Sequence, residues 1–123
     1  DDYFKRSPMQ EFDIPIFKRA YDLYKNFYQI RSSISKQDRY IIFLRCENLI
    51  LEVLEGILNA GQLSKDRKLP ILEQTSLKLN LLRVFIRLMK DVKSIDLKNY
   101  ANMEESIDEI GRMLGGWIKS TKE

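Results

Sequence analysis

The sequence has 123 residues, the length of one domain, and carries 21 Lys and Arg residues against 18 Asp and Glu residues, a formal net charge of +3. It has no histidine and one cysteine, which excludes histidine-based nucleophile pairs, histidine metal ligands and an internal disulfide. A hydrophobic content of 44% is enough for a buried core, and three prolines with five glycines favour a few long helices. We therefore expect one folded domain over residues 1–123, with no catalytic site, no cofactor and no bound metal.

Two periodic segments occupy the first half of the chain. The first runs from about residue 14 to 34, and its spacing predicts a buried aromatic stripe of Phe17, Tyr21, Tyr24, Phe27 and Tyr28. The second runs from about residue 36 to 60, between a predicted N-cap at Ser35 and a stop at Gly61. Its apolar face includes Cys46 as a buried thiol and is wide enough to contact more than one neighbouring helix.

Two further segments follow a polar linker. The third runs from about residue 69 to 93, with Pro70 in its first turn. The side predicted to be buried consists of Leu77, Leu81, Val84, Phe85, Leu88, Met89 and Val92. The fourth runs from about residue 97 to 120, after the cap candidates Ser94 and Asp96. Its apolar side consists of Tyr100, Met103, Ile107, Ile110, Leu114, Trp117 and Ile118.

Four amphipathic helices of about 20 residues, joined by short connections, pack most economically as an antiparallel up-down-up-down bundle. No segment shows the alternation of period two that a strand requires. The predicted fold is therefore an all-α four-helix bundle, with residues 1–12 irregular. No apolar run approaches the roughly 18 residues that span a bilayer, so we expect no membrane segment. One unpaired cysteine, without a secretion signal at the N-terminus, favours the cytoplasm.

Acidic residues repeat at helical spacing in the second and fourth segments, as a carboxylate metal site would require. The di-metal sites of helix bundles use Glu-x-x-His pairs, and this sequence has no histidine. In the fourth segment the acidic residues lie opposite Ile110 and Leu114 on a helical wheel. We therefore interpret them as a solvated face, with an i,i+4 ion pair between Asp108 and Arg112.

Basic residues concentrate in the third segment. Residues 65–98 carry nine basic and four acidic side chains, whereas residues 1–64 carry nine of each. Arg83, Arg87 and Lys90 stand at i, i+4 and i+7, on the side away from the predicted buried face, and Lys78 and Lys93 flank them. Cations spaced by about 5–6 Å suit a phosphate backbone. We predict that these five residues bind nucleic acid; the alternative is an ordinary solvated helix face.

The fourth segment contains an unusual glycine-rich stretch. Gly111, Gly115 and Gly116 lie within the helical pattern, where each costs about 1 kcal/mol relative to alanine. Gly111 and Gly115 clear a strip along the helix, and Met113 and Trp117 offer large apolar surfaces beside it. We predict that these five residues form an oligomer or partner interface; close packing inside the bundle is the alternative.

The chain from about residue 14 to 120 also resembles a known family. The run LPILEQTSLKLNLLRVFIRLMKDVKSIDLKNY, followed by IDEIGRMLGGWIKS, is similar to the accessory variability determinant (Avd) proteins of diversity-generating retroelements, whose four-helix family includes the proteins encoded in ribosomal RNA intervening sequences. The resemblance implies a non-enzymatic homopentameric barrel that binds the retroelement reverse transcriptase and its template RNA and supports mutagenic retrohoming. Arg83, Arg87, Lys90 and the EIGRMLGGWIK run are the matched positions.

A second hypothesis involves no nucleic acid. The wide apolar face of the second segment also fits a self-assembling four-helix scaffold or a protein-interaction module. RNA affinity that falls with salt concentration would favour the first hypothesis. A stable oligomer that ignores nucleic acid would favour the second.

Overall fold

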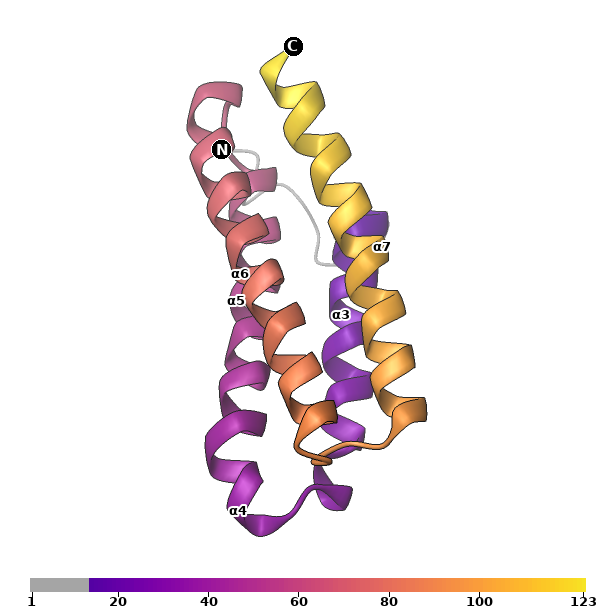
Figure 1. Cartoon of the computed structure of the whole chain (residues 1–123). Coiled ribbons are helices and arrows are strands. Elements are labelled where there is room, and N and C mark those ends of the chain that lie inside the picture. The colour runs from indigo at the N-terminus through magenta and orange to yellow at the C-terminus, as the bar shows by residue number, and fades with distance from the viewer. Residues whose placement is uncertain (1–13) are drawn as a thin grey trace.

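The computed structural model describes residues 14–123, which form an all-α structure of four long helices packed against each other, with no strand (Figure 1). The elements are α3 (Pro15–Gln29), the 3-10 turn η1 (Arg31–Ser33), α4 (Lys36–Asp38), the π-helical turn η2 (Arg39–Phe43), α5 (Leu44–Gly61), α6 (Lys65–Asp91) and α7 (Leu97–Lys122). α3 contacts α5 and α7, and α6 contacts the same two helices, so the long helices occupy the corners of a square. The predicted fold class is confirmed. The segment predicted to be irregular, residues 1–12, lies outside the described residues.

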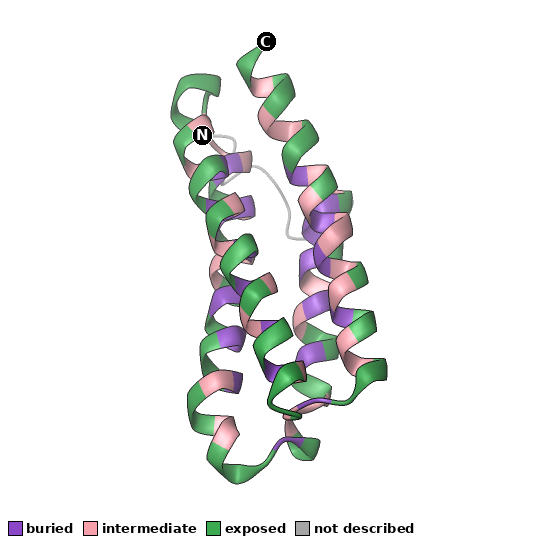
Figure 2. Cartoon of the chain, in the orientation of Figure 1, coloured by how far each residue is buried: buried purple, intermediate pink, exposed green. Residues whose placement is uncertain are grey.

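The core lies along the inward sides of the four helices, as the buried positions in Figure 2 show. On α3 the buried residues are Ile16, Phe17, Ala20, Leu23 and Phe27. The predicted aromatic stripe is therefore only partly right. Tyr21 and Tyr24 are half-buried and Tyr28 is 57% exposed. Tyrosines at the edge of a helix face keep their hydroxyl groups near solvent, whereas the Phe27 ring stacks on Phe43 with 4.3 Å between centroids.

The second helical region begins where the sequence predicts. Ser35 is the N-cap, and its hydroxyl accepts a hydrogen bond from the backbone N–H of Asp38 at 3.3 Å. α4, η2 and α5 follow one another directly, so residues 36–61 form one helical stretch that contains a π-helical turn. Such a turn inserts an extra residue and rotates its neighbours around the helix axis. Tyr40 and Ile41, both in this turn, are 60% and 69% exposed.

The buried side of α6 differs from the prediction. The buried residues are Leu72, Thr75, Leu79, Leu82, Ile86 and Met89. Of the predicted set, only Met89 is buried and Phe85 is partly buried, whereas the exposed members are Leu77, Leu81, Val84, Leu88 and Val92. The helix carries two apolar stripes at the same helical spacing, and the prediction selected the outer one. α6 also starts at Lys65, about one turn before the predicted start, so Pro70 lies in the second turn.

α5 and α6 approach most closely at Gly56. A Cβ atom at this position would overlap Thr75 Oγ1 of α6. Thr75 is buried, and its hydroxyl donates a hydrogen bond to the carbonyl of Ile71 at 2.7 Å. Only glycine leaves room for this hydroxyl between the two helices.

α7 matches its predicted buried side. Met103, Ile107, Ile110 and Leu114 are buried, and the flanking aromatic residues are partly buried. Asp96 is the N-cap, and its carboxylate accepts a hydrogen bond from the backbone N–H of Asn99 at 2.7 Å.

Within residues 14–123 the four helices differ in length, so α6 and α7 run past α3 at one end of the bundle. α3 has 15 residues, against 27 in α6 and 26 in α7. At 1.5 Å per residue, α6 and α7 extend roughly 17 Å further than α3. Figure 1 shows the upper part of α6 and α7 beyond the first turn of α3. In residues 14–123, no helix combines the length and hydropathy that crossing a bilayer requires.

Candidate nucleic-acid interface

The five basic residues predicted to bind nucleic acid follow α6 and its C-terminal turn, but they do not stand opposite the core. Arg83 and Lys90 are partly buried and lie beside α7, while Lys78 lies beside α5. Arg87 is the most exposed of the four helical cations, with a side chain 71% exposed. Lys93 follows the helix with a φ of 63°, in the left-handed region that closes the turn. The structure thus separates the predicted row into seam and surface positions.

Carboxylates partly neutralise the seam positions. Arg83 forms an ion pair with Asp108 of α7, and Lys78 Nζ lies 3.1 Å from Glu52 Oε1 of α5. These pairs join different helices, so they position α6 between its neighbours. The predicted Asp108–Arg112 pair is therefore wrong, because Asp108 points across the seam. Arg112 instead pairs with Glu109, with 3.6 Å between Nη2 and Oε2.

The remaining cations keep looser contacts. Arg87 Nε lies 3.9 Å from Asp91 Oδ2, and Lys90 Nζ lies 3.6 Å from Asp91 Oδ1. Lys90 Nζ also lies 4.7 Å from the centroid of the Tyr100 ring, a cation–π distance. The Arg87–Asp91 pair is exposed, and such pairs are worth about 0–1 kcal/mol. Arg87 and Lys93 are therefore the exposed members of the predicted row, whereas the Lys90 side chain is 27% exposed.

A second basic cluster lies where α3 turns into α4, and the sequence analysis missed it. An open cavity of about 410 Å³ is lined by Tyr28, Gln29, Arg31, Ser32 and Arg39. Arg39 Nε donates a hydrogen bond to the carbonyl of Ile34 at 3.1 Å, which holds its guanidinium group beside the cavity. Guanidinium groups beside an exposed tyrosine ring provide the phosphate contact and the stacking surface that single-stranded RNA uses. The available signal was the serine-rich turn between the two arginines.

Glu47 is the buried carboxylate beneath this cluster. It is 8% exposed, and its Oε2 accepts a hydrogen bond from the Tyr24 hydroxyl at 3.0 Å. Arg31 Nη1 lies 3.8 Å from Glu47 Oε1. Burial and then this hydrogen bond raise the pKa of Tyr24 above its ordinary value. The carboxylate therefore has two partners and holds Arg31 against the bundle.

The glycine–tryptophan stretch lies at the end where α6 and α7 run past α3. Among the described residues, no atom lies within 4 Å of a Cβ built on Gly115 or Gly116, so neither glycine makes room for one of the helices α3, α5 or α6. Gly111 has only ordinary contacts, 3.4 Å from Arg83 Nη2 and 3.7 Å from Leu79 Cδ2. The alternative of close packing inside the bundle therefore does not account for Gly115 and Gly116.

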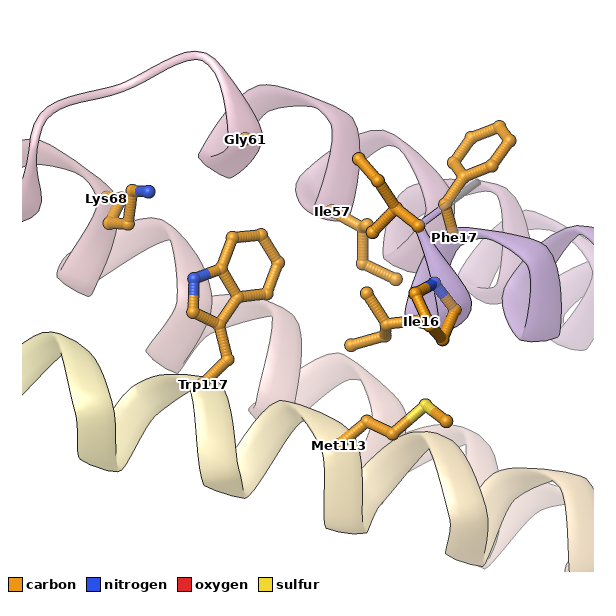
Figure 3. Close-up of a pocket in the computed structure, with 9 residues that line it drawn as sticks. Ile16, Phe17, Ile57, Gly61, Lys68, Met113 and Trp117 are labelled. Atoms are coloured by element: carbon orange, nitrogen blue, oxygen red, sulfur yellow. The ribbon is translucent and has the colours of Figure 1, made fainter. Parts of the chain in front are cut away.

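Met113 and Trp117 line a cavity of about 540 Å³ between α7 and the first turn of α3 (Figure 3). Trp117 and Met113 extend from α7 toward Ile16 and Ile57, and Lys68 lies beside the indole with its Nζ 5.4 Å from the ring centroid. The side of the cavity opposite the indole is formed by the start of α3, where Pro15, Ile16 and Phe17 line it. The cavity can hold an apolar side chain, with one cation at its edge.

The remaining candidate groups show no arrangement for catalysis. Cys46 is fully buried, and burial raises the pKa of its thiol to about 12, so the nucleophilic thiolate is suppressed. Within residues 14–123, no three Cys, Asp or Glu side chains gather as a metal ion would require.

Comparison with known proteins gives one result. A sequence model of a family described as bAvd-like matches residues 15–121 of the chain. A search of curated proteins found no match.

Proposed function

The chain belongs to the bAvd-like family of bacterial retroelement accessory proteins, and from this premise we propose that it binds the reverse transcriptase and the template RNA of a diversity-generating retroelement and so supports mutagenic retrohoming. Membership over residues 15–121 carries this proposal and implies the accessory role. Accessory proteins of this family are generally non-catalytic, so the protein acts by holding other components together. We further propose that it assembles into a homo-oligomer, a pentamer by resemblance, that works in the cytoplasm.

Two groups of residues support the RNA contact. Arg87 and Lys93 are exposed on the outer side of α6 and its C-terminal turn, and Lys90, Arg83 and Lys78 continue the row along the seams. A phosphate that reaches this row gains charge-assisted hydrogen bonds. The cavity beside Tyr28 offers a second contact of different chemistry, suited to an unstacked base.

For the reverse transcriptase, we propose contact through the glycine–tryptophan end. Met113 and Trp117 line an apolar cavity there, and Gly115 and Gly116 leave the neighbouring surface of α7 open for a partner backbone. A Trp117→Ala variant should then lose co-purification with the reverse transcriptase while its RNA affinity is unchanged. Equal losses of both activities would contradict separate contact sites.

The test of RNA binding compares two arginines in similar settings. The Arg87 side chain is 71% exposed with an i,i+4 carboxylate, and the Arg112 side chain is 72% exposed with an i,i+3 carboxylate. The affinity for labelled template RNA is measured by fluorescence anisotropy across a salt series. For each phosphate contacted, log K should fall by about 0.7 for every tenfold rise in salt concentration. Arg87→Glu should remove at least one contact and weaken binding at 0.1 M salt by about fivefold. Arg112→Glu is the control and should leave the slope unchanged.

The second candidate function is a scaffold that assembles without nucleic acid. The observation that favours it is the exposed apolar surface of α5 and α6, where Leu44, Leu51 and Val84 are 39%, 42% and 60% exposed. RNA affinity that does not depend on salt concentration, and that neither Arg87→Glu nor Arg112→Glu changes, would favour the scaffold over the RNA-binding proposal.

A further inference from the structure

A polar cavity lies where the last turns of α3 meet the first turns of α7, at the lower end of the bundle in Figure 1. Its volume is about 370 Å³, within the range of roughly 300–1,000 Å³ that is typical of small-molecule sites. Six polar side chains line it, and four of them are carboxamides: Asn26, Gln29, Asn99, Asn102, Glu105 and Ser106. We call it the amide cavity.

Packing between the two helices brings these side chains together. Apart from Glu105, the lining residues recur at intervals of three and four along each helix, so on each helix they share one face. Two apolar residues, Ile30 and Met103, also line the cavity. Met103 is 3% exposed and Ile30 is half-buried, whereas three of the four carboxamides are exposed. The cavity therefore has an apolar floor and a rim of carboxamides.

The fold does not account for these carboxamides. Three of the six asparagines of the chain line the cavity, although asparagine is a weak helix former that is favoured mainly at caps. None of the three is an N-cap, since Ile14 and Asp96 occupy those positions in α3 and α7. Within residues 14–123, their side chains and that of Gln29 form no hydrogen bond with another residue. Their donors and acceptors are therefore available to a ligand.

The hydrogen-bonding groups around the cavity suit the edge of a nucleobase. Each carboxamide presents donors and acceptors, and asparagine or glutamine can pair with a base through two hydrogen bonds. Unpaired bases of RNA are recognised along their edges, with the ring packed on a neighbouring side chain. The polarizable thioether of Met103 suits the face of such a ring. Glu105, which has no ion pair among the described residues, adds only acceptors, so it favours a base with an exocyclic amino group over uracil, which has none.

Gln29 connects the amide cavity to the cavity beside Tyr28, because it lines both. Arg31 and Arg39 line that second cavity, and guanidinium groups hold a phosphate by charge-assisted hydrogen bonds. Phosphate contacts position a nucleic acid without reading its sequence, whereas contacts to base edges specify it. Adjoining cavities of these two kinds therefore match the two parts of one nucleotide.

We propose that the amide cavity binds one unpaired base of the RNA, beside a phosphate held at Arg31 and Arg39, and prefers a base with an exocyclic amino group to uracil. The inference rests on the proposed RNA-binding function and adds a sequence preference to it. The cations of α6 supply affinity for any RNA backbone, and the amide cavity selects the base. Asn26, Gln29 and Asn102 are the residues assigned to the base edge.

The first test compares two pyrimidines. Oligocytidylate and oligouridylate of equal length carry the same phosphates, but the base has an amino group in one where it has a carbonyl oxygen in the other. Fluorescence anisotropy at one fixed salt concentration should show that the protein binds oligocytidylate about fivefold more tightly, the effect of one net hydrogen bond. Glu105→Gln introduces a donor beside the acceptor and should reduce this preference.

Matched variants locate the preference in the cavity. Asn26→Ala with Asn102→Ala removes two exposed carboxamides and should make the affinities for the two oligonucleotides equal. The control is Asn59→Ala with Asn80→Ala, because these asparagines are also exposed on helices but lie outside both cavities, and it should keep the preference. Alanine is the better helix former, so helical circular dichroism and the mass from light scattering should match the wild type in both.

Arg39→Gln separates the phosphate contact from the base contact. It should weaken the binding of both oligonucleotides by the same factor and reduce the salt slope by about 0.7, because a phosphate carries no sequence information.

Equal affinities of the wild type for the two oligonucleotides would overturn the amide cavity as a base site and leave RNA binding intact. A preference that survives Asn26→Ala with Asn102→Ala, or that the control also loses, would overturn it in the same way. A wild type that binds neither oligonucleotide at low salt would overturn the RNA-binding proposal itself, and this site with it.

Discussion

Gly56 and Gly115 should respond in opposite directions to the same substitution. Both lie inside helices, and neither has a positive φ, so replacement by alanine gains about 1 kcal/mol of helix propensity at each site. At Gly115 no atom lies within 4 Å of the added methyl group. Gly115→Ala should therefore raise the free energy of unfolding by about 0.5–1 kcal/mol.

At Gly56 the added methyl group meets Thr75. It overlaps Thr75 Oγ1 and lies 3.2 Å from both Thr75 Cβ and Cγ2. Relieving such overpacking costs about 1–3 kcal/mol, and displacing the hydroxyl from the Ile71 carbonyl costs about another 1 kcal/mol. After subtraction of the propensity gain, Gly56→Ala should lower the free energy of unfolding by about 1–3 kcal/mol.

Urea unfolding followed by helical circular dichroism, at one fixed protein concentration, measures both changes. A double variant, Gly56→Ala with Thr75→Ala, removes the overlapping hydroxyl and should recover at least about 1 kcal/mol relative to the sum of the single changes. Equal stabilisation by Gly56→Ala and Gly115→Ala would refute the close approach of α5 and α6 at Thr75.

Three further predictions concern single groups. Cys46→Ala should reduce the loss of stability that the wild type shows between pH 9 and about 12. A thiol whose pKa is raised on folding stabilises the folded state at pH values below the pKa of the unfolded state, and this stabilisation is lost as the pH rises through the pKa of the folded state. Urea unfolding at several pH values in this range measures the difference. Lys93→Gly should raise the melting temperature in circular dichroism, since glycine adopts the φ of 63° without the cost of about 1 kcal/mol that a side chain pays. Tyr24→Phe should leave Glu47 without its hydroxyl donor and lower stability by about 1–3 kcal/mol, whereas Tyr28→Phe, at an exposed position, should change it little in the same urea assay.

Much of the fold was predictable because the apolar residues of each helix recur at helical spacing, and on α7 they form a single side. On α7 the apolar residues Met103, Ile107, Ile110 and Leu114 recur at intervals of three or four, and they are the residues that the structure buries. Both well-defined caps, Ser35 and Asp96, were also visible, since a short polar side chain before an apolar run has a local role that needs no tertiary context.

The buried side of α6 was predicted wrongly because this helix has two apolar stripes, and periodicity alone does not show which of them faces the core. The inner stripe contains Thr75. Its hydroxyl donates a hydrogen bond to the Ile71 carbonyl, so this polar residue can be buried. Because the buried side was predicted wrongly, the basic row was predicted to face solvent, whereas Lys78 lies beside α5 and Arg83 and Lys90 lie beside α7. The cluster of Arg31 and Arg39 was missed because a turn, which periodicity does not describe, brings the two residues together.

The short length of α3 affects which signals report local unfolding of the protein. Among the described residues, α6 and α7 run past the start of α3, so amide protons in the last turns of α7 should exchange sooner than those near Ile107. Trp117, the single tryptophan of the chain, lies at this end, beside the first turn of α3. Its fluorescence therefore reports local opening at one end, and on heating it should change before the helical signal of the whole bundle.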